Sequence, residues 1–318
     1  MRRTVLEGAP SVGLAVSLLL TTCAAPAKPV AARDRLIHAR PGVTFDGSTR
    51  SSGWLRSEHP HKAVIAGTVG GVAVQVLLDT GAGVTVIDRA LVESVALELR
   101  GAIETVGVDG ASNAVAIVSG LALRLGTLTL SDIPAIAMDL AAARRGDDPR
   151  PIVILGVQVY HELILDVDYP QRRVALRHPQ AEPMPDGWRV PLRVLDDRRV
   201  AVALALPDGA PRDVLLDTGS DGGVYLFEPV AQDLGPIDTG NAAGAAVGGV
   251  GGSVAARRLT LPRIALADAW FTDVVCHMIP SPDQDMLRAG LVGLVGGRAL
   301  GHGRWVLDCA NGAAVLVR

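Results

Sequence analysis

The sequence predicts an all-β protein made of two similar halves that build one site between them. Aromatic residues make up only 3% of the chain, whereas glycine occurs 36 times and proline 20 times, a composition typical of many short strands and tight turns. A predicted hairpin that ends in Leu-Leu-Asp-Thr-Gly occurs twice, and the landmarks beyond each copy recur at nearly the same spacing. In a chain of 318 residues this self-similarity favours two homologous lobes.

Each copy of the motif follows two β-rich runs joined by a tight turn. Gly70 and Gly71 form the turn in the first half, and a Pro-Asp-Gly turn at residues 207–209 takes their place in the second. Turns of this composition between β-rich runs indicate hairpins. The predicted strands cover residues 64–69, 72–78, 200–206 and 213–216.

The repeat continues beyond the motifs. An apolar-apolar-Gly sequence follows each motif at nearly the same distance and ends at Gly156 after Asp79 and at Gly296 after Asp217. Another aspartate follows each of these glycines at an identical distance, Asp168 in the first half and Asp308 in the second. We interpret both of these later aspartates as strand-end or turn residues.

These landmarks divide the chain into five parts. Residues 1–32 are interpreted as an export signal or lipoprotein signal, and residues 33–57 as a spacer. The first lobe covers residues 58–178 and the second covers residues 188–318. Between them, residues 179–187 are rich in proline and polar side chains and are interpreted as a linker.

The amino terminus predicts export to the periplasm. Two arginines precede an apolar run at residues 12–20, which is too short for a membrane span and fits a secretory signal. Residues 20–23 then resemble a lipobox, in which Cys23 would become the lipid anchor of a bacterial lipoprotein. Ordinary cleavage within residues 24–32 is the alternative. Contact with a membrane is expected only through such an anchor.

Two further cysteines, Cys276 and Cys309, lie late in the chain. In an oxidising periplasm they could form a disulfide, and two buried free thiols are the alternative.

The duplicated motif has a direct chemical interpretation. A buried strand that ends in Asp79 or Asp217 projects a carboxylate from a rigid element, and the glycine that follows the threonine lets a partner backbone approach closely. Two carboxylates side by side cannot both ionise, so they share one proton and provide an acid and a base in one site. The supporting residues are Thr80, Gly81 and Ala82 in the first loop and Thr218, Gly219 and Ser220 in the second.

On these motifs, the two halves resemble a pair of retropepsin-type aspartic protease domains fused in one chain, similar to bacterial aspartyl protease family proteins and, in architecture, to pepsin. The resemblance covers residues 62–318. It implies a bilobal acid-protease fold, with two β-barrel-like lobes and a cleft between them. It also implies an aspartic endopeptidase that acts on polypeptides through Asp79 and Asp217, without metal or organic cofactor.

Two Gly-rich segments resemble the flaps that fold over substrate in this family. Glycine at these positions would permit positive φ and lid motion, and an exposed surface loop is the alternative interpretation. The flap residues are Val106, Gly107 and Val108 in the first half and Gly248, Gly249, Val250 and Gly251 in the second.

Other classes of function have less support. With 30 Lys and Arg against 33 Asp and Glu the net charge is −3, which argues against nucleic-acid binding. His59 and His61 are the only close histidine pair and lack a third ligand nearby, so no metal site is expected. We expect a monomer that acts as an internal pseudo-dimer. The rival hypothesis is a non-catalytic periplasmic peptide-binding lipoprotein that keeps the protease fold.

Ser220 is a further expected difference between the loops, because Ala82 takes its place in the first loop. We expect its hydroxyl to bind Asp217 and favour the charged form there, which leaves the proton on Asp79.

Overall fold

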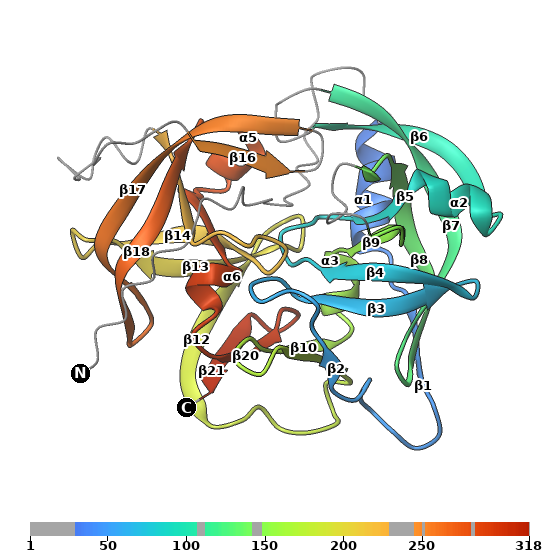
Figure 1. Cartoon of the computed structure of the whole chain (residues 1–318), viewed down its shortest axis with the longest axis horizontal. Helices are drawn as coiled ribbons and strands as arrows, with labels where there is room; N and C mark the ends of the chain where they lie inside the picture. Colours follow the sequence, from blue (N-terminus) through green and yellow to red (C-terminus); the bar gives the residue numbers. More distant parts are fainter. Residues whose placement is uncertain are drawn as a thin grey trace.

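A computed structural model describes residues 29–106, 112–141, 148–228, 245–249, 252–280 and 284–317. Strands dominate these residues, and they form two lobes that lie side by side (Figure 1). The helices within them are short, and none is long and apolar enough to cross a membrane. The helices are α1 (Pro29–His38), α2 (Arg89–Ser94), α3 (Val157–Tyr160), α5 (Gln284–Arg288) and α6 (Gly297–Leu300).

The first lobe is an eight-stranded sheet with the order β1-β8-β5-β9-β4-β3-β7-β6, and β7 also pairs with β8. That extra pairing curls the sheet onto itself. The predicted hairpin is present as β3 and β4, which pair antiparallel around the Gly70-Gly71 turn. The strands are β1 (Gly42–Phe45), β3 (Val64–Val69), β4 (Val72–Leu78), β5 (Thr85–Asp88), β6 (Glu98–Val106), β7 (Ser112–Leu125), β8 (Leu128–Met138) and β9 (Ile152–Leu155).

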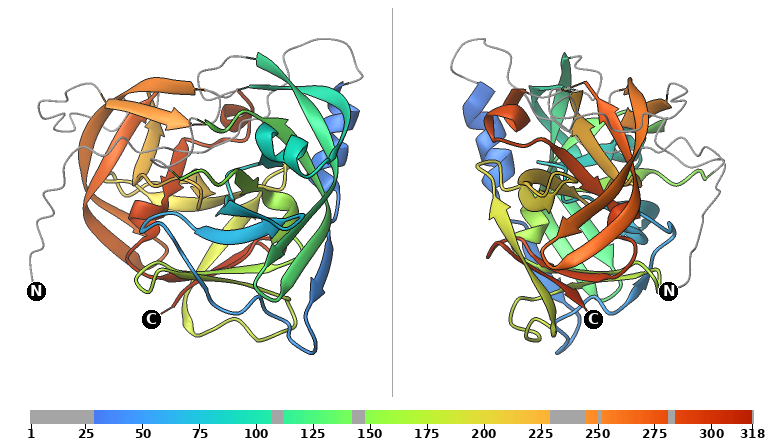
Figure 2. Two further views of the ribbon diagram at one scale, coloured as in Figure 1. Left: turned by 45° about the vertical axis from the view of Figure 1, so that its right-hand side comes forward. Right: turned by 90° about the vertical axis from the view of Figure 1, so that its left-hand side faces the viewer.

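The second lobe repeats this arrangement. Its strands follow the order β16-β17-β18-β15-β19-β14-β13, and β17 also pairs with β13. The β17–β18 hairpin curves around the side of this lobe that faces away from the first lobe (Figure 2). The strands are β13 (Val200–Ala205), β14 (Pro211–Asp217), β15 (Val224–Phe227), β16 (Ala245–Gly249), β17 (Gly252–Leu266), β18 (Ala269–Ile279) and β19 (Gly293–Gly296).

A third set of strands joins the two lobes and lies below both in Figure 1. It has the order β12-β21-β20-β10-β11-β2, and β12 continues from it into the second lobe. At its centre β10 of the first half pairs antiparallel with β20 of the second, with Asp166 opposite Val306. The strands are β2 (Leu55–Arg56), β10 (Ile164–Asp168), β11 (Arg173–Arg177), β12 (Gly187–Val194), β20 (Arg304–Asp308) and β21 (Ala313–Val317).

This central pairing shows where the pseudo-two-fold axis of the molecule lies. Asp166 and Val306 follow the apolar-apolar-Gly glycines of their halves at the same distance, so each occupies the position of the other in the repeat. Because they lie directly opposite each other, the axis that relates the halves passes between them. The two lobes therefore form one unit about this axis rather than two independent domains.

The core forms because the central strands are apolar along their whole length. Strands β9 and β15 are buried at every position, as expected for strands covered on both faces. One hydrophobic cluster runs from Ile65 in the first lobe through Leu165 in the central strands to Leu216 in the second lobe. This shared core fixes the relative position of the halves.

The segment 33–57, interpreted above as a spacer, is part of the fold. Strand β1 pairs with β8, strand β2 pairs with β11, and α1 buries Leu36 and Ile37. Helix α1 also begins at Pro29, inside the range assigned to the export signal. Short strands at the edges of a sheet have little local sequence signal, because their pairing depends on partners far along the chain.

Candidate active site

The two Asp-Thr-Gly loops occupy equivalent places in their lobes. Asp79 directly follows β4, and Asp217 is the last residue of β14. Each of these strands pairs in parallel with the strand that contains the later apolar pair of its half. In the first lobe β4 pairs with β9, and in the second lobe β14 pairs with β19. The amide of Asp79 donates a hydrogen bond of 3.0 Å to the carbonyl oxygen of Leu155, which fixes the start of its loop.

Threonine side chains bind the two loops to each other. The Thr80 hydroxyl donates to the carbonyl oxygen of Leu216, and the Thr218 hydroxyl donates to that of Leu78, each over 2.6 Å. Each hydroxyl oxygen also accepts a hydrogen bond of 3.1 Å from the amide of the opposite threonine. The four residues that supply these groups are buried, so the contact depends on protein partners rather than solvent.

The glycines of the motif are required by this close approach. A Cβ placed on Gly219 would lie 2.3 Å from Cγ of Asp79, and one on Gly81 would lie 2.7 Å from Cγ of Asp217. Each glycine therefore lies against the carboxyl group of the opposite loop, where a side chain would collide. Gly156 is similarly confined, because its Cβ would lie 2.6 Å from the carbonyl carbon of Val84.

Both carboxyl groups are held in the same way. Oδ1 of Asp79 accepts hydrogen bonds from the amides of Gly81 and Ala82, at 2.8 and 3.0 Å. Oδ1 of Asp217 accepts from the amides of Gly219 and Ser220, at 2.9 and 3.0 Å. The Oδ2 atom of each is buried and accepts no hydrogen bond from any other described residue. The two carboxyl groups interact with each other, and a hydrogen bond between them requires that one of them carries a proton.

The environment separates the acidities of the two groups. Burial, together with the neighbouring charge of Asp217, raises the pKa of Asp79 well above its usual range. Burial raises the pKa of Asp217 to about 6. Asp217 is thus the more acidic of the two, and near neutral pH the pair as a whole carries one proton and one negative charge.

Comparison with known families agrees with this geometry. The family model described as "Aspartyl protease" matches residues 65–159 and again residues 202–295, which together are more than half of the chain. The chain belongs to the aspartyl protease family. The family model matches each half of this aspartyl protease family member once, as the duplicated motif predicts.

Solved structures also match the chain. One is a retropepsin-like aspartic protease from Rickettsia conorii, which is 15% identical, with a TM-score of 0.27, over 41% of this chain and 94% of its own. No curated protein sequence matches the chain.

The structure brings the six expected supporting residues of the loops together around the pair. Ser220 differs from expectation in one respect. Its amide contacts Asp217, whereas its hydroxyl oxygen accepts a hydrogen bond of 3.3 Å from the amide of Gly222. The expected hydrogen bond from this hydroxyl to Asp217 is therefore not seen, and the location of the shared proton stays a prediction.

The two expected flaps fall on hairpins of the fold. Strands β6 and β7 pair up to Val106 and Ser112, and β16 and β17 pair up to Gly249 and Gly252. Both hairpins lie on the upper side of the molecule in Figure 1, opposite the central sheet. Of the flap residues, Val106, Gly248 and Gly249 belong to these strands, while Gly107, Val108, Val250 and Gly251 lie outside the described residues.

The cysteine expectations have a clear outcome. Cys276 and Cys309 are free and buried, so the disulfide interpretation is wrong and the alternative of two buried thiols holds. Cys276 lies within β18 and Cys309 follows β20, so different sheet segments bury them. Cys23, the expected lipid anchor, lies outside the described residues.

Asp168 and Asp308 end β10 and β20, as expected for strand-end residues. Each accepts a hydrogen bond of 3.1 Å from an amide three residues later and so closes a turn.

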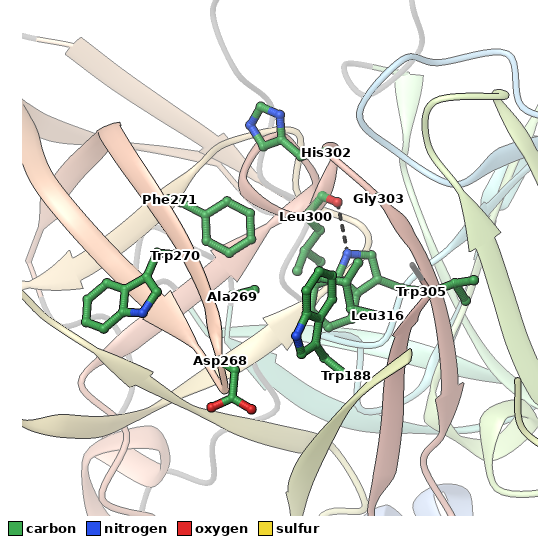
Figure 3. A pocket seen from close by; sticks show the side chains of 11 residues that line it. Trp188, Asp268, Ala269, Trp270, Phe271, Leu300, His302, Gly303, Trp305 and Leu316 are labelled. Atoms are coloured by element: carbon green, nitrogen blue, oxygen red, sulfur yellow. Dashed lines mark hydrogen bonds between the residues drawn. The ribbon is translucent and has the colours of Figure 1, made fainter. Parts of the chain in front are cut away.

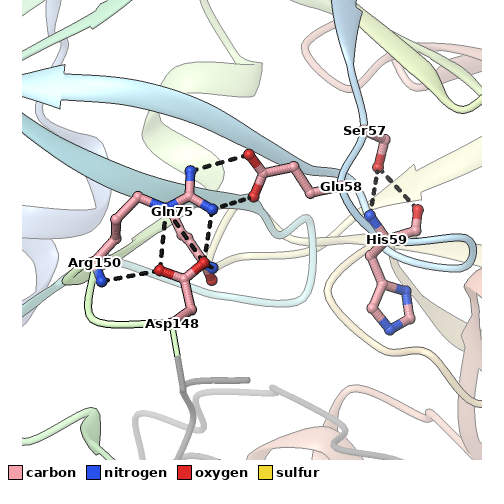
Figure 4. Close-up of polar contacts among 6 residues, drawn as sticks. All are labelled: Ser57, Glu58, His59, Gln75, Asp148 and Arg150. Carbon is pink, nitrogen blue, oxygen red and sulfur yellow. Dashed lines mark hydrogen bonds and ion pairs between the residues drawn. The ribbon is translucent and has the colours of Figure 1, made fainter. Parts of the chain in front are cut away.

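One contact near the site was missed at the sequence level. His59 and Lys62, just before β3, lie 3.9 and 3.8 Å from Oδ2 of Asp221, which follows the second Asp-Thr-Gly-Ser motif directly. His59 is folded into a turn in which the Ser57 hydroxyl donates to its carbonyl oxygen (Figure 4). Within the described residues no group of three or more potential ligands forms a metal site.

Beside this turn lies a second polar group of the first lobe. Arg150 binds both oxygens of Glu58, at 3.0 and 2.7 Å, and also contacts Asp148 (Figure 4). Asp148 is thus an ion-pair partner, and the hydrogen bonds from Arg150 hold its pKa below the usual range.

A hollow of about 520 Å³ on the second lobe is separate from the aspartate pair. Its lining contains Trp188, Trp270, Phe271 and Trp305, a local concentration of aromatics in a chain that has few (Figure 3). None of the Asp-Thr-Gly loop residues lines it.

Proposed function

We propose that this protein is an aspartic endopeptidase in which Asp79 and Asp217 act as a catalytic dyad. The observation that supports this most directly is that the two buried carboxyl groups, one from each lobe, interact with each other, while no other described residue donates to their Oδ2 atoms. Their separated acidities supply an acid and a base in one place. Aspartic proteases are the standard example of this logic.

In the proposed reaction Asp217 is the base and Asp79 is the acid. The Asp217 carboxylate accepts a proton from a water molecule, and the oxygen of that water attacks the peptide carbonyl carbon. Asp79 donates its proton to the carbonyl oxygen, so that a neutral tetrahedral diol forms. Transfer of the proton held by Asp217 to the peptide nitrogen, with return of one hydroxyl proton to Asp79, breaks the C–N bond and restores the starting state of the dyad.

The proposed substrate is an extended polypeptide bound between the lobes, below the two hairpins. Both aspartates are fully buried, so substrate access requires a movement of the protein, which we assign to the β6–β7 and β16–β17 hairpins. Hairpin edges offer backbone groups that pair with an extended chain, and pockets beside them accept its alternate side chains.

The test is cleavage of a diverse peptide library, read by mass spectrometry, between pH 3 and pH 8. Wild type should cut internal peptide bonds, and Asp79→Asn and Asp217→Asn should each lower kcat/KM by at least about 1,000-fold. Asp268→Asn, an exposed aspartate in the β17–β18 turn, is the matched control and should cut normally. An inert wild type, or equal cleavage by both dyad variants, would refute the proposal.

The rival function is peptide binding without hydrolysis. Its distinctive outcome is a peptide that co-purifies with folded wild type and remains uncut at every pH. The Asp-Thr-Gly motif is intact in both halves, and this favours the endopeptidase.

A further inference from the structure

The two halves differ at one charged position beside the dyad. Gly83 follows the first Asp-Thr-Gly-Ala motif, whereas Asp221 takes the equivalent place after Asp-Thr-Gly-Ser in the second half. The carboxylate of Asp221 lies on the second lobe but contacts Lys62, which belongs to the first lobe, with 3.8 Å between Nζ and Oδ2. The side chain of Lys62 is only 8% exposed and that of Asp221 only 16%, so water screens the pair weakly.

The backbone holds Lys62 close to both loops. The Ser57 hydroxyl donates to the Lys62 carbonyl oxygen over 2.8 Å, and the next carbonyl, of Ala63, accepts from the amide of Leu78, one residue before Asp79. On the other side, a Cβ on Gly297 of α6 would lie 1.7 Å from the carbonyl oxygen of His61, which shows how tightly this segment packs against the second lobe. The segment is thus fixed between the two halves of the site.

We propose that the Lys62–Asp221 ion pair, which exists on one side of the pseudo-two-fold axis only, is a positioning device that decides which aspartate of the dyad is ionised. Lys62 supplies a positive charge that favours the carboxylate form of Asp217, and the negative charge of Asp221 limits the size of this effect. The pair breaks the symmetry of a site whose two loops are otherwise nearly identical. As a statement about catalysis the inference rests on the proposed function, but as a statement about ionisation it does not.

The other groups around the dyad and the pair are accounted for. Tyr160 lies near Asp79, and Tyr169 and Tyr225 lie near Asp217; burial raises the pKa of all three phenols, so they stay neutral. The charge of Lys62 acts on Asp217 and lowers its pKa against the larger effect of burial. Among the described residues, His59, His61 and Tyr225 interact with Asp221, and the charge of Arg298 acts on His61 and Tyr225.

The two members of the pair make opposite predictions. In Lys62→Met the favourable charge is lost, so the pKa of Asp217 should rise by at least about 0.5 unit. In Asp221→Asn a nearby negative charge is lost while Lys62 keeps its own, so the pKa of Asp217 should fall. If the contact only supported the loop, both substitutions would shift the pKa of Asp217 in the same direction. Lys62→Arg should behave as wild type, because it keeps the charge.

The measurement is a ¹³C NMR titration of protein labelled at the aspartate carboxyl carbon, with the dyad signals assigned from Asp79→Asn and Asp217→Asn. Arg150→Met, which removes a half-buried cation elsewhere in the first lobe, is the control and should leave the dyad unchanged. Opposite shifts in Lys62→Met and Asp221→Asn support the inference. Shifts in the same direction, no shift, or an equal shift in Lys62→Arg overturn it.

The titration needs no substrate, so the two proposals can fail separately. If wild type cleaves no peptide but the opposite shifts appear, the inference stands and the endopeptidase falls. If wild type cleaves peptides, the acidic limb of kcat/KM should move with the NMR value in each variant. Cleavage whose acidic limb stays fixed in both variants overturns the inference and leaves the endopeptidase intact.

Discussion

Thr80 and Thr218 exchange hydrogen bonds across the pseudo-two-fold axis, each amide donating to the hydroxyl oxygen of the other over 3.1 Å. Each hydroxyl in turn donates to a backbone carbonyl of the opposite strand. The network closes on itself, and every member is buried. The loops that carry the two aspartates are therefore fixed to each other, and the geometry of the pair depends on both lobes at once.

Removal of one hydroxyl should break this network. In Thr80→Val the shape is kept, but the carbonyl of Leu216 and the amide of Thr218 lose their partners. Two unsatisfied buried groups should lower the free energy of unfolding by about 2–4 kcal/mol. Thr80→Ser keeps the hydroxyl and should cost about 1 kcal/mol, from the lost methyl group. Urea denaturation measures both, and equal losses in the two variants would show that the hydroxyl contributes little.

The aspartate pair should make stability depend on pH. The folded pKa of each group is raised, so its contribution is fully present below the unfolded value of about 3.9 and is lost as pH rises through the folded value. For Asp217 that loss occurs as pH rises through about 6, and it continues at higher pH as Asp79 ionises. The Asp217→Asn variant has no buried charge at this position, so its free energy of unfolding at pH 8 should exceed that of wild type by about 3 kcal/mol.

Thermal unfolding between pH 4 and pH 8 tests this dependence. The difference between Asp217→Asn and wild type should be small at pH 4 and grow with pH. Asp268→Asn, an exposed control, should follow wild type throughout. A constant difference at all pH values would contradict the raised pKa of the pair.

The same acidities predict the pH dependence of the proposed hydrolysis. The active form has a charged Asp217 and a protonated Asp79, so kcat/KM should increase as pH rises through about 6. It should decrease again at higher pH, where Asp79 loses its proton. The profile belongs to the pair as a whole. A maximum at pH 3 with no activity left at pH 6 would contradict this assignment.

The sequence was sufficient to predict the two loops because their signal is local and duplicated. The Asp-Thr-Gly motifs and the later glycines recur at matched positions, and the structure brings Asp79 and Asp217 together as expected. The end of β10 at Asp168 also follows from the spacing.

Features that arise from contacts between the halves were not predicted. The role of Lys62 depends on Asp221, which lies far along the chain in the other half, and neither residue lies in a recognisable pattern. The pairing of β1 and β2 likewise depends on distant strands. For Cys276 and Cys309 the sequence left two outcomes open, because only the fold decides whether two thiols can meet.

Asp166, next to the pseudo-two-fold axis, should be important for the union of the lobes. It is fully buried and binds Arg304 of the second half, at 2.9 and 2.7 Å, and Arg177 of the first half, at 3.1 Å. Asp166→Asn removes the buried charge that Arg304 and Arg177 share, although Arg177 keeps its exposed partner Glu182, and should lower the free energy of unfolding by about 3–5 kcal/mol. Asp46→Asn breaks an exposed ion pair with Arg124, and there a loss of at most about 1 kcal/mol is expected in the same urea denaturation. Similar losses in the two variants would mean that the buried ion pair does not hold the halves together.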